Sequence, residues 1–250
     1  MAYQDDIKKA AALLLPWNKL SGCNILVTGA TGLIGGCLAD VLMAHKGRNY
    51  NVYASGRNEE RAGRRFLKYA DDNSFHFVKY DVAHPLEYDV NFQYIIHAAS
   101  GAYPEEFIKH PVEVIKGNIN GVDNLMGYGI QHGIKRLLYI SSGEVYGEGD
   151  GRVFTENYSG YVDCTSLRSC YPSSKRAAET LCISYGAEYG IDVVIARPCH
   201  VYGPGFTESD IRVYAQFIRI VIRKDNIVMK STGEQKREWC FFVDCVSALL

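Results

Sequence analysis

The sequence predicts an α/β fold in which helices cover both faces of a parallel, doubly wound sheet. Six short runs rich in β-branched and aromatic residues recur along the chain, and longer stretches with helical spacing of apolar residues separate them. The short runs are apolar throughout instead of alternating, which is typical of central strands buried on both faces. Alternation of strand and helix of this kind builds a parallel sheet.

Each element has its own place in this pattern. The expected strands are Ile25–Thr28, Asn51–Ala54, Phe75–Tyr80, Tyr94–His97, Leu137–Ser141 and Val193–Ala196. The clearest helices are expected at Leu33–His45, Val112–His132, Ser173–Tyr189 and Ile211–Arg223. Residues 1–21 are expected to form a helical extension ahead of the first strand. The last seven residues, Asp244–Leu250, are an amphipathic stretch that we interpret as the start of a truncated helix.

The composition excludes several classes of function. The chain has 250 residues, of which 47% are apolar and 22% charged, with a formal net charge of −1. This charge balance argues against nucleic acid or an anionic membrane as the main partner. The eight cysteines include no CxxC pair and no zinc-ligand spacing, so we expect no metal and a reduced, cytoplasmic compartment. The apolar run Ala10–Leu15 is too short to span a bilayer.

Three glycines, each three positions after the one before, lie around the junction of the first expected strand and the first long helix. They are Gly29, Gly32 and Gly35. Glycine at such a turn lets a pyrophosphate approach the backbone closely, and the amino end of the helix supplies N–H donors and a favourable dipole. The sequence therefore predicts a dinucleotide site of the Rossmann type at this turn.

The end of the second expected strand bears on which dinucleotide binds. NAD sites usually place an acidic residue there, on the ribose 2′-hydroxyl. In this chain the strand is followed by Arg57 and Asn58, with no carboxylate before Glu59. A guanidinium suits the geometry of a phosphate, so Arg57 favours NADP. NAD, with Arg57 as a solvated loop residue, stays open.

A candidate catalytic set follows the fifth expected strand and the start of a long helix. Tyr171 and Lys175 are four residues apart, so on a helix they share one face. A nearby cation favours the phenolate of a tyrosine that would otherwise be a poor base at neutral pH. Ser142 and Glu144 come directly after an expected strand, at the sheet edge where ligands bind in such folds.

Six motifs in this order, TGATGLIG, HAAS, SSGEVYG, YPSSK, RPCHVYGPG and REWCFFVDCV, resemble the extended short-chain dehydrogenase/reductases, and specifically their NAD-dependent epimerase/dehydratase family. The resemblance covers residues 21–250. It implies an enzyme that uses NAD or NADP to oxidise the C4 hydroxyl of a nucleotide-linked sugar, and that then epimerises or decarboxylates the keto intermediate. It assigns residues 22–200 to the Rossmann domain and residues 201–250 to the start of the sugar-nucleotide lobe. We also expect a homodimer.

The resemblance implies a role for each matching residue. Ser142 matches the hydroxyl that holds the sugar, Tyr171 the base, and Lys175 the cation that tunes this base and contacts the cofactor. Glu144 is expected to act on the substrate after oxidation. The expected cofactor-binding residues are Gly29, Thr31, Gly32, Leu33, Ile34, Gly35, Arg57, Asp81, Val82, Ala98, Ala99, Asn118, Lys175, Pro198 and Val201. The expected substrate-binding residues are His200, Arg212 and Arg237.

Within the family, residues 167–180 are similar to those of UDP-glucuronate decarboxylases. The 4,6-dehydratases carry an Asp-Glu pair where this chain has Gly143 and Glu144, which counts against dehydration. Arg57 departs from the acid of the decarboxylases, and His200 from the asparagine that is common in the family. Two further functions stay open: an NADPH-dependent carbonyl (keto-sugar) reductase, and a catalytically silent protein that binds the cofactor as a sensor.

Overall fold

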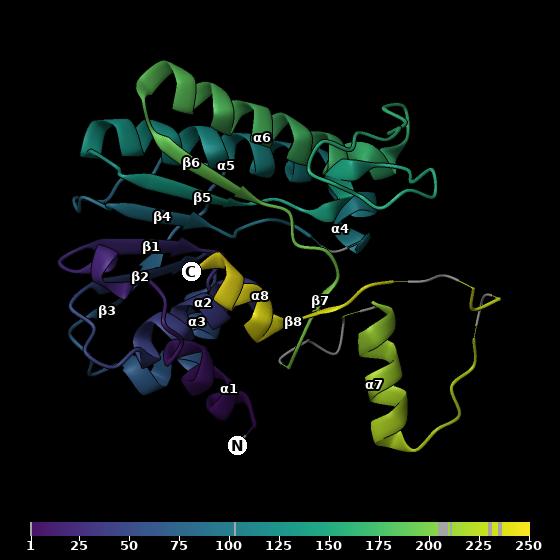
Figure 1. Ribbon diagram of the computed structural model, residues 1–250, viewed down its shortest axis with the longest axis horizontal. Helices are drawn as coiled ribbons and strands as arrows, with labels where there is room; N and C mark the ends of the chain where they lie inside the picture. Colours follow the sequence, from purple (N-terminus) through teal and green to yellow (C-terminus); the bar gives the residue numbers. More distant parts are fainter. Residues whose placement is uncertain (1, 103, 205–209, 211, 230–231, 235–236) are drawn as a thin grey trace.

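The structure is a computed structural model that describes residues 2–102, 104–204, 210, 212–229, 232–234 and 237–250. A six-stranded parallel sheet forms its centre, in the order β3-β2-β1-β4-β5-β6 (Figure 1). The strands are β1 Asn24–Thr28, β2 Asn51–Gly56, β3 Phe75–Lys79, β4 Tyr94–His97, β5 Arg136–Ile140 and β6 Asp192–Ala196. All six expected strands are present, and the strand order confirms the predicted Rossmann-type doubly wound sheet.

The α-helices are α1 Ala2–Ala11, α2 Leu33–Ala44, α3 Glu59–Phe66, α4 Pro104–Lys109, α5 Pro111–His132, α6 Cys170–Tyr189, α7 Val213–Arg223 and α8 Phe242–Leu249. Short 3₁₀ turns are η1 Trp17–Leu20, η2 Leu67–Tyr69, η3 Gly143–Tyr146 and η4 Leu167–Ser169. A separate parallel pair is formed by β7 Val201–Tyr202 and β8 Cys240–Phe241. Ile211, where the sequence predicts a helix to begin, lies outside the described residues. None of the described helices is both long and apolar enough to cross a membrane.

Helices cover the two faces of the sheet as separate layers. In Figure 1, α5 and α6 lie along one face, and α2 and α3, with α1 and α8, lie on the other. Each layer closes over its own apolar cluster, because β1, β2 and β5 contribute side chains to both faces. The two long helices α5 and α6 each end at a glycine with left-handed backbone, Gly133 (φ +67°) and Gly190 (φ +71°). This is the residue type that accepts that conformation without a Cβ penalty.

The first and last helices, α1 and α8, pack against α2. Phe242 of α8 is fully buried and stacks on Tyr3 of α1, with ring centroids 5.4 Å apart. Asp40 of α2 is a buried carboxylate, and four side chains bond it: Tyr3 (2.5 Å), Lys68 (2.8 Å), Tyr69 (2.9 Å) and Arg65 (3.1 Å). α8 therefore packs with α1 and α2 beside the sheet, whereas α7 stands apart from the sheet in Figure 1.

The topology determines where a ligand binds. β1 and β4 are neighbours in the sheet, although β2 and β3 lie between them in the chain. The chain leaves β1 and β4 toward opposite halves of the sheet, which opens a crevice at their carboxyl ends. The glycine turn follows β1 at this edge, Ala98 follows β4, and Ser141 follows β5.

Candidate active site

The glycine turn is shaped by close backbone packing. Gly29 has a left-handed backbone (φ +64°), and a Cβ there would lie 2.7 Å from the carbonyl oxygen of Ala98. A Cβ on Gly35 would lie 2.5 Å from the carbonyl oxygen of Gly29. Gly32 is the N-cap of α2 and carries no side chain to cover the helix terminus. The first and third glycines are thus needed for the fold of the turn, and the second leaves the amino end of α2 open to an anion.

A single large cavity, of about 2070 Å³, runs from this turn along the carboxyl edge of the sheet. Among the residues expected to form the site, those lining it are Gly29, Gly32, Leu33, Ile34, Gly35, Ala98, Ser142, Glu144, Tyr171, Lys175, Pro198, His200, Val201, Arg212 and Arg237. Expected residues that are not part of its lining are Thr31, Arg57, Asp81, Val82, Ala99 and Asn118. The glycine turn, the candidate catalytic set and the expected substrate residues therefore share one space.

Tyr171 and Lys175 are both buried in the first turns of α6. The helix begins at Cys170, three residues before the position expected from the sequence, because η4 leads directly into it. The Lys175 ammonium donates to the carbonyl of Ile140 (2.9 Å) and lies 5.8 Å from the Tyr171 ring centroid. Burial lowers the pKa of Lys175 to about 7. Burial also raises the pKa of Tyr171, while hydrogen bonds with Ser142 and Ser100 act in the opposite direction.

Ser100 and Asn118 connect the strand ends to the catalytic helix. Asn118 of α5 is buried, and its amide donates to the hydroxyl of Ser174 (2.9 Å). Its carbonyl oxygen accepts from Ser100 (2.8 Å). Both ends of the Asn118 amide are thus bonded to protein groups, so this side chain holds Ser100 and α6 in place beside Tyr171.

Glu144 is held by a guanidinium. It lies in η3, where its backbone N–H donates to the hydroxyl of Ser142 (3.2 Å). Both carboxylate oxygens accept from Arg168, at 2.5 and 2.6 Å. Arg168 in turn lies over the ring of Phe107 (4.7 Å), and that ring stacks on Tyr171 with centroids 4.7 Å apart. A chain of contacts therefore links the Glu144 carboxylate to the candidate base.

The expected substrate residues gather where the β7–β8 pair meets the cavity. Nε2 of His200 and Nη1 of Arg237 are 2.6 Å apart, and burial and this neighbouring cation lower the pKa of His200. The guanidinium of Arg212 pairs with Asp210 at 2.5 Å. Two arginines thus face a cavity that also holds the candidate base, an arrangement suited to a diphosphate.

Three residues of this site were not assigned a role by the sequence analysis: Ser100, Phe107 and Arg168. Arg168 lies three residues before Tyr171, within the segment that is similar to UDP-glucuronate decarboxylases. That similarity was the only sequence signal for it. Ser100 and Phe107 reach the site through tertiary contacts with α5 and α6, which no local pattern of the sequence reveals.

The comparisons with known proteins agree with this geometry. The statistical model of the NAD dependent epimerase/dehydratase family matches residues 25–250. UDP-glucuronic acid decarboxylase 6 of Arabidopsis thaliana is 35% identical over 233 residues, which are 92% of this chain and 66% of that protein. UDP-glucuronic acid decarboxylase 1 of Xenopus tropicalis is 32% identical, over 90% of this chain and 52% of that protein. The chain spans 50–66% of the length of these and the other curated UDP-glucuronic acid decarboxylases that it matches.

Solved structures share the fold. The UDP-N-acetylglucosamine 4-epimerase of Methanobrevibacter ruminantium superposes with a TM-score of 0.76 at 23% identity, covering 91% of this chain and 72% of the other. The UDP-glucuronic acid 4-epimerase of Bacillus cereus, in complex with UDP-glucuronic acid and NAD, gives 0.74 at 24% identity, covering 89% and 70%. At these identities the likeness concerns the fold alone. The family match and the relatives at 32–35% identity confirm the family expected from the motifs. The chain belongs to the NAD-dependent epimerase/dehydratase family.

Proposed function

We propose that this protein uses NAD or NADP to oxidise the C4 hydroxyl of a nucleotide-linked sugar, and that it then epimerises or decarboxylates the keto intermediate. One observation carries this proposal: Ser142, Tyr171 and Lys175 line the same cavity as the glycine turn. UDP-glucuronic acid is the first substrate to test, because the relatives at 31–35% identity are UDP-glucuronic acid decarboxylases.

The residues of the turn fit a nicotinamide dinucleotide. Gly32 leaves the amino end of α2 uncovered, and the neighbouring Leu33, Ile34 and Gly35 line the cavity with it. Backbone N–H groups and the helix dipole there would hold the pyrophosphate. When bound there, a nicotinamide dinucleotide would supply a reversible hydride acceptor for the C4 hydrogen.

Side chains of this protein would bind the C4 hydroxyl and accept its proton. Ser142 would hold the C4 hydroxyl, and the Tyr171 phenolate would take its proton as the C4 hydrogen leaves as hydride and a C4 carbonyl forms. Burial raises the pKa of Tyr171 above its ordinary value, and hydrogen bonds with Ser142 and Ser100 and the charge of Arg168 oppose this rise. These contacts act in the direction of the phenolate that the step requires. Arg212 and Arg237 would hold the diphosphate of the substrate.

The test is incubation of the protein with UDP-, dTDP-, GDP- and CDP-sugars, followed by mass spectrometry. Loss of CO₂ identifies decarboxylation, and an isomer of equal mass identifies epimerisation. We expect Tyr171→Phe to reduce hydride transfer by roughly 10²- to 10⁴-fold, because it removes the proton acceptor and keeps the ring. Tyr189→Phe, at the exposed end of the same helix, should behave like the parent. An inactive parent across the panel would contradict the proposal.

An NADPH-dependent keto-sugar reductase is the second candidate, and the arginines near the end of β2 favour it. A reductase must exchange its cofactor at every turnover, whereas an epimerase or a decarboxylase regenerates it in place. A cofactor that stays bound through purification supports the first proposal. A cofactor that exchanges freely, with NADPH consumed at each turnover, supports the reductase.

We also propose a cytoplasmic homodimer. All eight cysteines are free thiols, which suits a reducing compartment. Val112 and Ile115 of α5 and Ile183 of α6 are exposed apolar side chains on the helical layer that covers one face of the sheet. Exposed apolar side chains on such a layer are compatible with a subunit contact. Light scattering coupled to size-exclusion chromatography measures the mass directly, and a monomer at micromolar concentration would contradict the dimer.

A further inference from the structure

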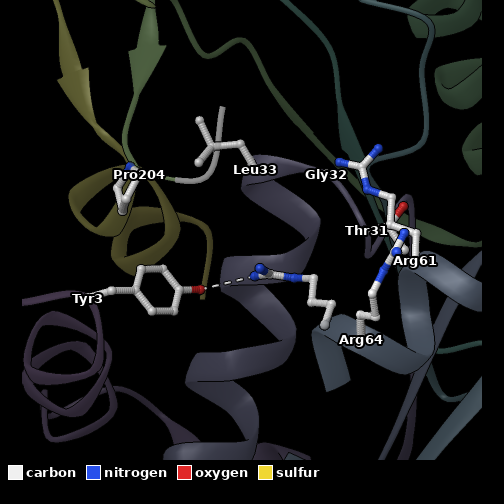
Figure 2. Close-up of a pocket in the computed structure, with 8 residues that line it drawn as sticks. Tyr3, Thr31, Gly32, Leu33, Arg61, Arg64 and Pro204 are labelled. Atoms are coloured by element: carbon white, nitrogen blue, oxygen red, sulfur yellow. Dashed lines mark hydrogen bonds between the residues drawn. The ribbon is translucent and has the colours of Figure 1, made fainter. Parts of the chain in front are cut away.

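A second cavity, of about 380 Å³, lies beside the glycine turn, and the proposed chemistry makes no use of it. Its walls come from the turn (Thr31, Gly32), from α3 (Arg61, Arg64, Arg65) and from Tyr3 of α1. Figure 2 shows Arg61 and Arg64 close to Thr31 on one side of α2, with Tyr3 on the other side. Three guanidinium groups and the amino end of a 12-residue helix thus surround one space.

The three arginines differ in how far their charge is already neutralised. Arg65 is bonded to Asp40 (3.1 Å) and to the hydroxyl of Tyr3 (3.0 Å), and Lys68 shares the same carboxylate. Arg64 pairs with Glu60 at 3.1 Å. The guanidinium of Arg61 has no ion-pair partner among the residues that the structure describes.

The charges around this cavity therefore do not cancel. Asp40 offsets Arg65, and Arg61 pairs with no carboxylate of the residues that the structure describes. Among the arginines that line the cavity, Arg61 therefore carries the uncompensated positive charge beside the amino end of α2. A phosphate monoester is an anion that this charge and the helix terminus favour. A neutral or cationic ligand is not favoured in this way.

The position of the cavity identifies which phosphate it would receive. Thr31 lies between the cavity and the end of β2, since a Cβ on Gly56 would lie 3.5 Å from the Thr31 methyl group. In dinucleotide-binding sheets, the end of β2 is where the ribose 2′-hydroxyl lies. The carboxylates that follow are engaged elsewhere, Glu59 with Lys79 (2.8 Å) and Glu60 with Arg64.

We propose that this cavity is the subsite for the 2′-phosphate of NADP, with Arg61 as its main cation and Arg64 as the second. The inference rests on the proposed dinucleotide site at Gly29–Gly35. It differs from the sequence expectation in the residue that would distinguish NADP from NAD, which is Arg61 instead of Arg57. Arg57 lies 3.9 Å from Asp81 and is not part of the lining of this cavity. Arg61 lines the cavity and has no ion-pair partner among the described residues.

Isothermal titration with NADP, NAD, 2′,5′-ADP and 5′-ADP tests the assignment. In Arg61→Gln, we expect the affinity for NADP and 2′,5′-ADP to fall about 10- to 100-fold, the usual effect of losing a charge-assisted hydrogen bond. The affinity for NAD and 5′-ADP should stay within about twofold, because neither ligand carries the 2′-phosphate. Lys116→Gln removes the same charge from the exposed surface of α5 and should leave all four affinities unchanged.

The outcomes separate this inference from the proposed function. Equal loss of NAD and NADP affinity in Arg61→Gln overturns the 2′-phosphate subsite, as does a parent that binds both dinucleotides equally well. A larger loss of NADP affinity in Arg57→Gln than in Arg61→Gln overturns the choice of Arg61 as the main contact. A parent that binds neither dinucleotide overturns the dinucleotide site itself, and the proposed function with it.

Discussion

The carboxylate of Glu144 and the phenol of Tyr171 are coupled through Arg168. The pair between Glu144 and Arg168 is about half exposed, so it contributes little to stability. The pair instead fixes the position of the Glu144 carboxylate, because both of its oxygens accept from one guanidinium that lies over Phe107. The charge of Glu144 raises the pKa of Tyr171 and the charge of Arg168 lowers it. At the scale of single residues, the charges of Glu144 and Arg168 thus have opposite effects on the pKa of Tyr171.

This geometry predicts that Glu144 acts after the first hydride transfer. Glu144→Gln keeps the shape and removes the charge and the proton acceptor. We expect cofactor reduction to continue at close to the parent rate and the following step to slow, so that reduced nicotinamide and keto-sugar accumulate. Stopped-flow absorbance of the nicotinamide follows this directly. A loss of the first step as large as that in Tyr171→Phe would place Glu144 in the oxidation, and unaltered kinetics would make it structural.

At the scale of elements, the strand, glycine turn and helix at residues 24–44 fold as the sequence predicted. The run of strand, turn and helix is local, and glycine spacing reports backbone geometry directly. The six strands were predictable for the same reason, since buried parallel strands are apolar throughout. The contacts of Asn118 with Ser100 and Ser174 were not predictable, because they join residues 18 and 56 positions apart. The two-residue strands β7 and β8 are too short to leave a pattern.

Of the three glycines, Gly32 is the one whose substitution tests binding without breaking the turn. A Cβ at Gly29 or Gly35 would lie 2.7 Å or less from backbone atoms, whereas at Gly32 the nearest contact is 3.2 Å. We expect Gly32→Val to abolish dinucleotide binding, because the side chain covers the amino end of α2, and to leave the circular dichroism spectrum unchanged. Gly127→Val, with open space around its Cβ, is the matched control. Parent-like affinity in folded Gly32→Val would remove the site from this turn.

At the scale of the whole molecule, buried polar groups join elements that are distant in the chain. Asp40 ties α2 to α1, α3 and η2, and the Asp40 side chain is only 2% exposed. Asp40→Asn leaves Arg65 and Lys68 without their carboxylate. We expect a loss of about 3–5 kcal/mol in the free energy of unfolding by urea, the usual effect of breaking a buried ion pair. Glu60→Gln, which breaks an exposed pair on α3, should cost at most about 1 kcal/mol. Equal effects would show that the Asp40 cluster does not stabilise the fold.

His97 links the central strands in a similar way. The ring is 1% exposed, and its Nδ1 lies 2.8 Å from the hydroxyl of Thr28 on the neighbouring strand. That hydroxyl also accepts from the backbone N–H of Ala99, so the pair connects the ends of β1 and β4 beneath the glycine turn. Burial, with the nearby charge of Lys175, lowers the pKa of His97 to about 3. The folded protein therefore keeps this imidazole neutral at a pH where the unfolded chain protonates it.

A histidine whose pKa is lowered by folding makes the protein less stable in acid. Between the unfolded pKa of about 6.5 and the folded value of about 3, the unfolded chain binds one more proton. The free energy of unfolding should then fall by up to about 1.4 kcal/mol for each pH unit from this residue. Urea unfolding at several pH values from about 7 to about 4 measures the slope. His97→Gln should flatten it by this amount, because the glutamine amide can bond Thr28 without titrating. Parallel slopes for the parent and His97→Gln would show that His97 does not couple proton binding to folding.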